Sequence, residues 1–373
     1  MSSTPNNIYY TGNPKAPLIP EKWKKLPFVD PKLAEDPKYY VAPKDLRNAV
    51  NIALELGLPL LLTGEPGVGK SCLARSLNRE LGHKEADLLH YTVKSDTRDS
   101  DLFYSYDTLS RFHAVHGQIN MNDEAAQQKA EDAAHPRRFI RYQALGLAIL
   151  QAKGRDNIPS GIMTDEALEA FPKQRRRAVV LIDEIDKAPH DMPNDILNEI
   201  ERMEFRIPEL FIDETIKLDT EEDKKHRPIV IITSNGIREL PEAFLRRCLY
   251  FHLTMPKFKE ELENTDPNEV SVEAIVASRF GEDHFNNREE LLGDALSLFQ
   301  YLRQDSLRGL QRKPSLAEFL DWLRYLSKSN DSTTRLIERN DFEVSVKSAL
   351  LKNQKDQTRI EALIEGWKNK AKS

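Results

Sequence analysis

The stretch Gly64-Glu65-Pro66-Gly67-Val68-Gly69-Lys70-Ser71 decides the fold of this chain. A glycine, four further residues, a second glycine, a lysine and a serine follow one another in the order typical of a phosphate-binding loop. The glycines let backbone N–H groups turn inward around phosphates, and the N-terminus of a following helix adds partial positive charge. Lys70 would reach the β- and γ-phosphates, and the Ser71 hydroxyl would hold Mg²⁺. The segment from Gly64 through Cys72 is therefore a candidate nucleotide-binding site.

The residues on both sides of the loop have the required character. Residues 60–63 are a short apolar run between Pro59 and Gly64, which predicts a buried parallel strand. After the loop, leucines recur with helical spacing at positions 73, 77 and 81, and Gly82 ends the pattern. A strand, a glycine loop and a helix in this order disfavour the alternative, which is a chance glycine turn.

Length and composition bound the class of protein. The 373 residues are enough for two or three domains, and 31% of them are charged, which predicts a soluble chain. The net charge of -6 argues against a general nucleic-acid binder, although it leaves a local basic groove open. The only cysteines are Cys72 and Cys248, and neither an apolar leader nor a long apolar run is present. We therefore expect a cytoplasmic protein that is neither secreted nor membrane-spanning.

We expect three parts along the chain. Residues 1–39 are rich in proline and lysine and predict an irregular arm, either packed on the core or bridging to a neighbouring subunit. Residues 40–254 would form the nucleotide-binding core, with inserts at about 99–150 and 153–177. Residues 255–373 have the patterns of helices.

The two inserts carry weaker patterns. Residues 103–106 and 111–115 flank a polar turn and predict a β-hairpin. Residues 117–137 have almost no large apolar side chains and predict an exposed or disordered loop, before a helical pattern returns over 140–150. The second insert ends in the basic run 173–177, which we interpret as a solvated face, with a nucleic-acid contact as the alternative.

A pair of carboxylates follows a second apolar run. Residues 178–182 predict a central strand buried on both faces, and Asp183 and Glu184 come directly after it. Ligands bind at the carboxyl ends of the strands in parallel α/β sheets. We expect Asp183 to hold the Mg²⁺ that Ser71 also contacts, and Glu184 to orient and deprotonate the attacking water. The alternative, two surface acids after a strand, is disfavoured by the phosphate-binding loop upstream.

Three more apolar segments predict core strands. They are residues 88–93, 229–233 and 249–253. Residues 229–233 lead into Asn235, whose amide could hold the attacking water or sense the γ-phosphate. Asn235 is therefore a second candidate catalytic group beside Glu184.

The remaining segments predict helices and one more hairpin. Apolar residues recur with helical spacing over 192–203, 291–302 and 315–326, and Ser315 with Glu318 fits a capping box. Residues 205–207 and 215–218 alternate and could pair. Residues 332–373 suggest two charged helices.

Taken together, these motifs resemble the AAA+ ATPases. The resemblance covers about residues 40–330 and rests on 64–71, 180–184, 233–235 and 240–247 in that order. Within this family the chain is most similar to the MoxR-like branch. The finer match lies in the segments 183–189 and 240–243 and in the insert near 99–150.

The resemblance implies a fold and an assembly. The fold would be α/β, an αβα P-loop core with a parallel five-stranded sheet, followed by an α-helical lid. The assembly would be a homo-oligomer, usually a hexameric ring, otherwise a helical one, with ATP between subunits. A neighbour would donate an arginine finger, for which Arg247 is the first candidate and Arg246 the second. The adenine base is expected near Tyr40 and Val41.

The chain departs from the family pattern in the lid. The family normally brings a basic residue to the phosphates from inside the helix that would begin near Ser315. Here Arg312 and Lys313 precede Pro314 instead. Lys313 is retained as a candidate contact to the nucleotide.

Three functions are compatible with this pattern. The first is a chaperone-like machine that uses ATP and Mg²⁺ to remodel a protein client, with a partner or adaptor such as a von Willebrand factor A domain protein. The second is a nucleotide-switched scaffold in a bacterial defence or stress system. The third is a restriction-type DNA motor driven by GTP or ATP, against which the pI of about 5.9 counts.

Overall fold

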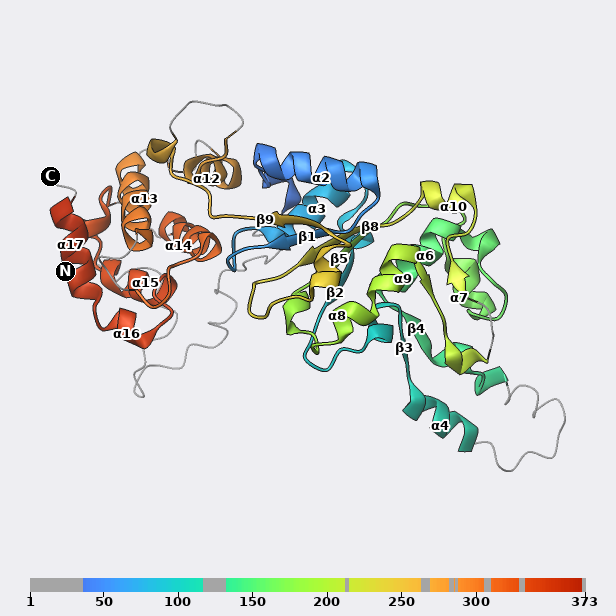
Figure 1. Ribbon diagram of the computed structural model, residues 1–373. Coiled ribbons are helices and arrows are strands. Elements are labelled where there is room, and N and C mark those ends of the chain that lie inside the picture. Colours follow the sequence, from blue (N-terminus) through green and yellow to red (C-terminus); the bar gives the residue numbers. More distant parts are fainter. Residues whose placement is uncertain are drawn as a thin grey trace. The chain divides into compact units, whose positions relative to one another are not determined.

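Figure 1 shows a computed structural model of the chain. It describes residues 36–116, 132–211, 215–262, 269–281, 285, 288–304, 310–328 and 333–370. The chain divides into two compact units. The core unit comprises Lys44–Gly64 and Lys70–Leu253, and the helical unit comprises Met1–Pro43, Glu65–Gly69 and Thr254–Ser373. Most of the predicted arm, 1–35, and residues 117–131 of the predicted loop lie outside the described residues.

A five-stranded parallel sheet forms the centre of the core unit, as predicted. Its strand order is β2-β5-β8-β1-β9. The strands are β1 (Leu60–Thr63), β2 (Leu89–Thr92), β5 (Val179–Asp183), β8 (Ile229–Thr233) and β9 (Leu249–His252). All four residues of β5 before Asp183 are buried, so both faces of the sheet are covered at this strand. In register, Thr233 pairs with Leu62 and Asp183 with Thr92, which brings the ends of neighbouring strands to one edge.

Helices cover the sheet and end where glycine permits it. Helix α3 (Lys70–Glu80) contacts β5 and β8, and α6 (Ala144–Lys153) contacts β2 and β5. The predicted stop of α3 is confirmed, because Gly82 has φ +77° just beyond the helix. Leu81 lies past the helix end and is exposed. The predicted single helix over 192–203 is wrong, since the backbone breaks at Ile196 into two short helices.

The other core-unit helices are short, apart from the one that precedes β1. They are α2 (Lys44–Leu56), α4 (Thr108–His116), α7 (Asp165–Ala170), α8 (Met192–Asp195), α9 (Leu197–Arg202), α10 (Glu221–Lys225) and α11 (Glu242–Leu245). Single turns of 3₁₀ helix in this unit include Glu85–Asp87, Asp99–Leu102, Pro136–Phe139, Arg155–Asn157, Ile185–Lys187 and Pro208–Leu210.

The predicted hairpin over 103–115 is wrong. Strand β3 (Tyr104–Tyr106) pairs antiparallel with β4 (Ile140–Tyr142), far along the chain. The segment expected to be its partner is helix α4 instead. Asp107 caps this helix by accepting hydrogen bonds from the Ser110 N–H at 2.9 Å and from the Ser110 hydroxyl at 2.7 Å. The helical pattern over 140–150 accordingly begins as strand β4, and α6 starts at Ala144.

The hairpin predicted from 205–207 and 215–218 is confirmed, as the antiparallel pair β6 (Glu204–Phe205) and β7 (Ile216–Lys217). The second insert packs on the core rather than leaving it, because Ile162, Met163 and Phe171 are buried in the main apolar cluster.

The basic run 173–177 is tied to the core unit by its three arginines. Arg175 forms an ion pair with Asp223, and Arg176 with Asp87 at 2.5 Å. Arg177 donates to the carbonyl of Lys225. Hydrogen bonding from Arg176 lowers the pKa of Asp87 to about 2. These guanidinium groups therefore serve contacts within the chain.

Asp223 is the centre of a buried charge cluster that we expect to matter for stability. Its side chain is 0% exposed and lies beside Lys153 at 3.6 Å and Arg175, whose side chains are 8% and 19% exposed. Asp223→Asn leaves both cations without their buried carboxylate, so it should lower the free energy of unfolding by about 3–5 kcal/mol.

Urea unfolding would measure this loss. The matched control is Glu222→Gln, which removes an exposed ion pair to Lys225 on the same helix and should leave the free energy of unfolding nearly unchanged. Equal midpoints for the two variants would contradict a structural role for the buried cluster.

The helical unit has its own core. Its helices are α12 (Val272–Phe280), α13 (Glu289–Arg303), α14 (Leu316–Lys328), α15 (Phe342–Ala349), α16 (Gln354–Gln357) and α17 (Ile360–Lys370), with 3₁₀ turns at Pro37–Tyr39, Lys259–Glu261 and Leu336–Glu338. Phe299 of α13 stacks on Phe319 of α14 with ring centroids 4.1 Å apart. The predicted capping box is present, as the Ser315 N–H donates to Glu318 at 2.8 Å and the Glu318 N–H to Ser315 at 3.3 Å. Within the described residues 333–370 the structure has three α-helices, α15 to α17, where the sequence suggested two.

Within the described ranges, none of the helices has both the length and the apolar character needed to cross a bilayer.

Candidate functional site

The first glycine of the phosphate-binding loop has no room for a side chain. Gly64 has φ +140°, and a Cβ at this position would lie 2.2 Å from the carbonyl oxygen of Leu253. The last glycine of the loop, Gly69, has φ +97°, and a Cβ there would lie 3.3 Å from the ring of Tyr40. The chain therefore needs glycine at both ends of the loop, and Tyr40 lies beside it.

Lys70 is buried, and its ammonium group donates hydrogen bonds to neighbouring oxygen atoms. Lys70 is the first residue of α3, and it is only 6% exposed. The ammonium group donates to the carbonyl of Gly64 at 2.8 Å and to Oδ1 of Asn235 at 2.8 Å. The loop lysine and the asparagine after β8 thus meet, as their predicted roles require. A triphosphate would offer the ammonium group further oxygen acceptors at this place.

Ser71 and Asp183 meet at the end of β5. The Ser71 hydroxyl lies 3.0 and 3.1 Å from the two carboxylate oxygens, and the Thr233 hydroxyl donates to Oδ1. Burial acts to raise the pKa of Asp183, but hydrogen bonds from His90, Thr233 and Ser71 outweigh it and hold that pKa below its usual value. Asp183 is therefore an anionic carboxylate beside a hydroxyl.

These oxygen donors fit Mg²⁺. In nucleotide sites this ion takes one or two protein ligands and completes its shell with phosphate oxygens and water. Among the described residues there is no group of three or more His, Cys, Asp or Glu side chains arranged for a metal. The pair Ser71 and Asp183 suits an ion that arrives with a phosphate, rather than one held by the protein alone.

Glu184 has a constrained backbone and a carboxylate with two partners. Its φ of +61° and ψ of +48° are left-handed, which is unusual for a residue with a side chain. The Glu184 N–H donates to the Thr233 hydroxyl at 3.0 Å. One carboxylate oxygen accepts from the Asn235 amide at 3.3 Å and the other from Lys187 at 2.6 Å. Hydrogen bonding to Glu184 raises the pKa of Lys187.

Asn235 therefore joins two groups of the site. Its amide oxygen accepts from Lys70, and its amide nitrogen donates to Glu184. The backbone N–H groups of Asn235 and Ile237 lie 3.3 and 3.0 Å from the carboxylate of Asp186, which fixes the turn after β8. One side chain thus links the phosphate-binding lysine to the candidate general base.

The comparisons with known proteins decide the family. A model of the AAA domain, dynein-related subfamily, matches residues 59–248, which is just over half of the chain. The chain belongs to this family. It is an AAA+ ATPase by fold and by family.

Solved structures similar to this AAA+ chain include two whose overall similarity is low. A presumed ATPase from Cytophaga hutchinsonii is 16% identical, with 90% of this chain and 92% of that chain covered and a TM-score of 0.33. Domain III of the replication initiation protein DnaA from Thermotoga maritima is 12% identical, with 88% and 100% covered and a TM-score of 0.37. Neither adds to what the family model shows. No curated protein matches the chain.

The middle of the AAA+ phosphate-binding loop, Glu65–Gly69, is itself part of the helical unit. Glu65 accepts a hydrogen bond at 2.8 Å from Arg303, at the end of α13, and the same guanidinium group donates to the Pro314 carbonyl at 2.7 Å. The Gly67 carbonyl accepts from the Ala317 N–H at 3.2 Å. Sequence patterns did not single out Arg303, because its carboxylate partner, Glu65, is far from it in the sequence.

For the remaining candidate nucleotide-binding residues, the structure gives a position, and their role stays a prediction. Val68 is buried at 7% exposure, and Cys72 is half-buried at the start of α3. Pro66 lies in the loop and Val41 directly follows Tyr40. In the lid, Arg312 forms an ion pair with Glu318 at 2.9 Å, and Lys313 is its neighbour in sequence.

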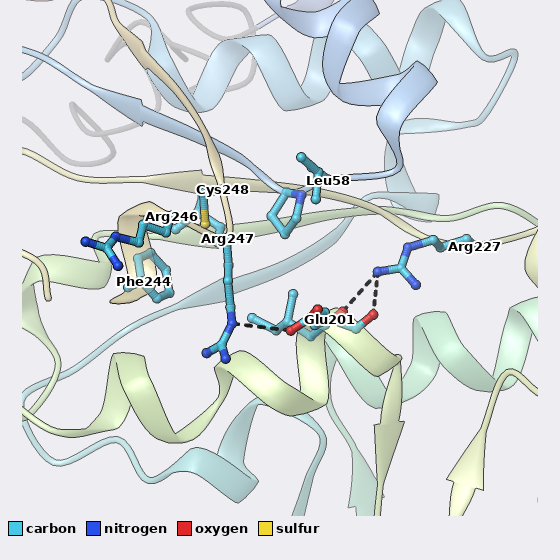
Figure 2. Close-up of a pocket in the computed structure, with 10 residues that line it drawn as sticks. Leu58, Glu201, Arg227, Phe244, Arg246, Arg247 and Cys248 are labelled. Atoms are coloured by element: carbon cyan, nitrogen blue, oxygen red, sulfur yellow. Dashed lines mark hydrogen bonds and ion pairs between the residues drawn. The ribbon is translucent and has the colours of Figure 1, made fainter. Parts of the chain in front are cut away.

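The two arginine-finger candidates of this AAA+ chain line a pocket of about 160 Å³ in the core unit. Figure 2 shows Arg247 reaching toward Glu201, with Nε 3.3 Å from Oε2, whereas Arg246 extends away from Glu201. Arg246 pairs instead with Glu242 at 2.9 Å. The pocket is lined by Leu58, Pro59, Ile200, Glu201, Arg227, Ile232, Phe244, Arg246, Arg247 and Cys248.

Two further polar groups line this pocket, the Arg227 guanidinium group and the Cys248 thiol. Arg227 donates to the carbonyls of Gly57 at 3.2 Å and Glu201 at 2.8 Å. Burial raises the pKa of the Cys248 thiol to about 12, so the thiol is uncharged. In the described part of the chain, the acidic partners of Arg246 and Arg247 are these surface glutamates, and neither arginine contacts Asp183 or Glu184. This arrangement is compatible with a finger that acts on another subunit.

Proposed function

We propose that this chain binds ATP with Mg²⁺ and hydrolyses it to ADP and phosphate. The observation that carries the proposal is the Asn235 amide, which contacts Lys70 at one end and Glu184 at the other. Such a link places the lysine that would bind the γ-phosphate close to the carboxylate that would activate water. A bound phosphate and its attacking water would both lie within reach of this edge of the sheet.

Each group has one role in the proposed reaction. Lys70 binds the β- and γ-phosphates, while Ser71 and Asp183 hold Mg²⁺, which neutralises charge on the phosphate oxygens. Glu184 accepts a proton from water as the water oxygen bonds to the γ-phosphorus and the bond to the bridging oxygen breaks. Asn235 orients that water. Lys187, which forms an ion pair with the Glu184 carboxylate at 2.6 Å, would hold that carboxylate in place.

We further propose that the chain acts as a MoxR-like ring or helical assembly in the cytoplasm. The support is the position of Arg247, whose partner in its own subunit is Glu201 rather than the Asp183–Glu184 edge. An arginine that acts in a neighbour would then make turnover depend on assembly. The assembly would remodel a protein client, directly or through an adaptor such as a von Willebrand factor A domain protein. A nucleotide-switched scaffold would use the same site with slow turnover that no client changes.

The nucleotide itself is the next prediction. Because Tyr40 lies beside Gly69, we expect the base next to residues 40–42 and a preference for adenine. Competition against a fluorescent ATP analogue in the presence of Mg²⁺ would measure this preference. ATP should displace the analogue at a concentration at least about tenfold lower than GTP, a difference of about 1.4 kcal/mol. Displacement by GTP at equal concentration would contradict it and favour the restriction-type motor.

A further inference from the structure

His90 stands on the strand next to the one that ends in Asp183. It belongs to β2, which pairs in parallel with β5, and the register places Thr92 beside Asp183. Side chains alternate along a strand, and Leu89 and Tyr91 pack against the main apolar cluster. The side chains of His90 and Thr92 therefore lie on the opposite face of β2, away from that cluster. This alternation brings the imidazole to the Asp183 carboxylate.

Three side chains hold that carboxylate in the described structure. Thr233 donates to Oδ1, Ser71 lies 3.0 and 3.1 Å from Oδ1 and Oδ2, and the His90 ring nitrogen Nε2 lies 3.5 Å from Oδ2. The Ser71 oxygen is also an expected ligand of Mg²⁺, so a bound ion would compete for its contact with the carboxylate. Thr233 and His90 are then the two groups that fix the carboxylate whether or not the ion is bound.

The imidazole is itself held in place. The Thr92 hydroxyl lies 3.3 Å from Nε2 of His90 on the same face of β2. The His90 side chain is 34% exposed, and that of Asp183 is 18% exposed. His90 is therefore not part of the apolar core, and its removal leaves no cavity in that core.

We propose that His90 is a positioning residue for Mg²⁺, which orients the Asp183 carboxylate by holding Oδ2. This inference rests on the proposed function, because it concerns the metal that would accompany ATP. The terminal torsion of an aspartate is broad, so a carboxylate held at one oxygen can still rotate. Partners that orient a metal-binding group without touching the metal typically change metal affinity by about 10–100-fold.

The proposal separates metal binding from nucleotide binding. His90 contacts neither Lys70 nor the glycines of the loop among the described contacts, so it has no direct part in holding the phosphates. Loss of the imidazole should therefore leave the affinity for nucleotide without metal unchanged. It should reduce only the additional affinity that Mg²⁺ supplies, since the two ligands are thermodynamically linked.

The test is the dissociation constant of a fluorescent, non-hydrolysable ATP analogue, measured on the full chain in EDTA and in a Mg²⁺ titration. For His90→Ala we expect an unchanged constant in EDTA and a Mg²⁺ midpoint raised by about 10–100-fold. His90→Gln retains an N–H donor on a side chain of similar reach and should recover most of the parental midpoint. His190→Ala is the matched control, because it removes an exposed histidine beside another carboxylate, Asp191, and should change neither value.

The outcomes distinguish this inference from the proposed function. If the parent binds the analogue and Mg²⁺ strengthens that binding equally in His90→Ala, the positioning role is wrong while the proposed function stands. Equal weakening in EDTA and in Mg²⁺, or failure of both His90 variants to fold, shows a merely structural role and also overturns the inference. Failure of the parent to bind the analogue removes the proposed function and the inference together.

Discussion

Glu184→Gln should bind ATP and retain it unhydrolysed. Glutamine keeps the size of the side chain and can still meet the Asn235 amide, but it cannot accept a proton from water. Loss of a general base typically lowers the rate by about 10²–10⁴-fold. Phosphate release under multiple turnover, together with the nucleotide recovered from the purified complex, would measure both effects.

Lys70→Ala should already fail to bind ATP. It removes the buried ammonium group that meets the Gly64 carbonyl and the Asn235 amide, so binding of the triphosphate should be lost together with turnover. The pair of variants therefore separates binding from chemistry. Glu221→Gln and Lys224→Ala are matched controls, because they form an exposed ion pair with each other away from the site and should leave both quantities unchanged. Parental turnover in Glu184→Gln would show that another group is the general base.

Arg247→Ala should keep ATP binding and lose most turnover. In its own subunit this guanidinium group contacts Glu201, so its proposed target is the γ-phosphate bound to a neighbour. An arginine finger supplied in this way is worth about 10³–10⁵ in the catalytic rate. Arg202→Ala, which removes an exposed arginine paired with Glu204, is the matched control and should retain turnover.

Mixing experiments show whether the finger acts in trans. Lys70→Ala keeps its finger but cannot bind ATP, whereas Arg247→Ala binds ATP but has no finger. Combined, the two inactive proteins should regain part of the activity through mixed interfaces. Turnover per subunit of the parent should also rise with protein concentration, because heterologous contacts must form first. A demonstrably monomeric sample with full activity per chain would exclude the trans mechanism.

The sequence predicts those parts of the fold that depend on local patterns. Three of the core strands, β1, β5 and β8, are apolar runs that are mostly buried on both faces, so four or five consecutive residues are enough to predict each of them. The segment 108–116 shows the limit of this reasoning. Residues 111–115 within it are predicted to be the second strand of a hairpin, yet a cap at Asp107 makes the segment a helix, and the partner of β3 begins at Ile140. A pairing across so many residues leaves no local signal.

The same distinction applies to the candidate site. The loop, Asp183 with Glu184, and Asn235 each follow a strand that the sequence identifies, so their meeting at one edge of a parallel sheet could be expected. His90 and Arg303 could not be found in this way. The position of His90 depends on which strand pairs with β5, and the contact of Arg303 depends on which loop residue lies beside the end of α13.

The left-handed backbone of Glu184 has a consequence for how this position can vary. Glycine and asparagine adopt this conformation with less strain than glutamate does, and a residue held there typically costs about 1–3 kcal/mol. The backbone conformation therefore favours glycine or asparagine at position 184, whereas the proposed reaction requires glutamate. Selection for thermal stability alone would therefore replace Glu184, and the selected variants would be more stable but would no longer hydrolyse ATP. A survey of tolerated substitutions at this position would thus yield opposite rankings when scored by melting temperature and by phosphate release.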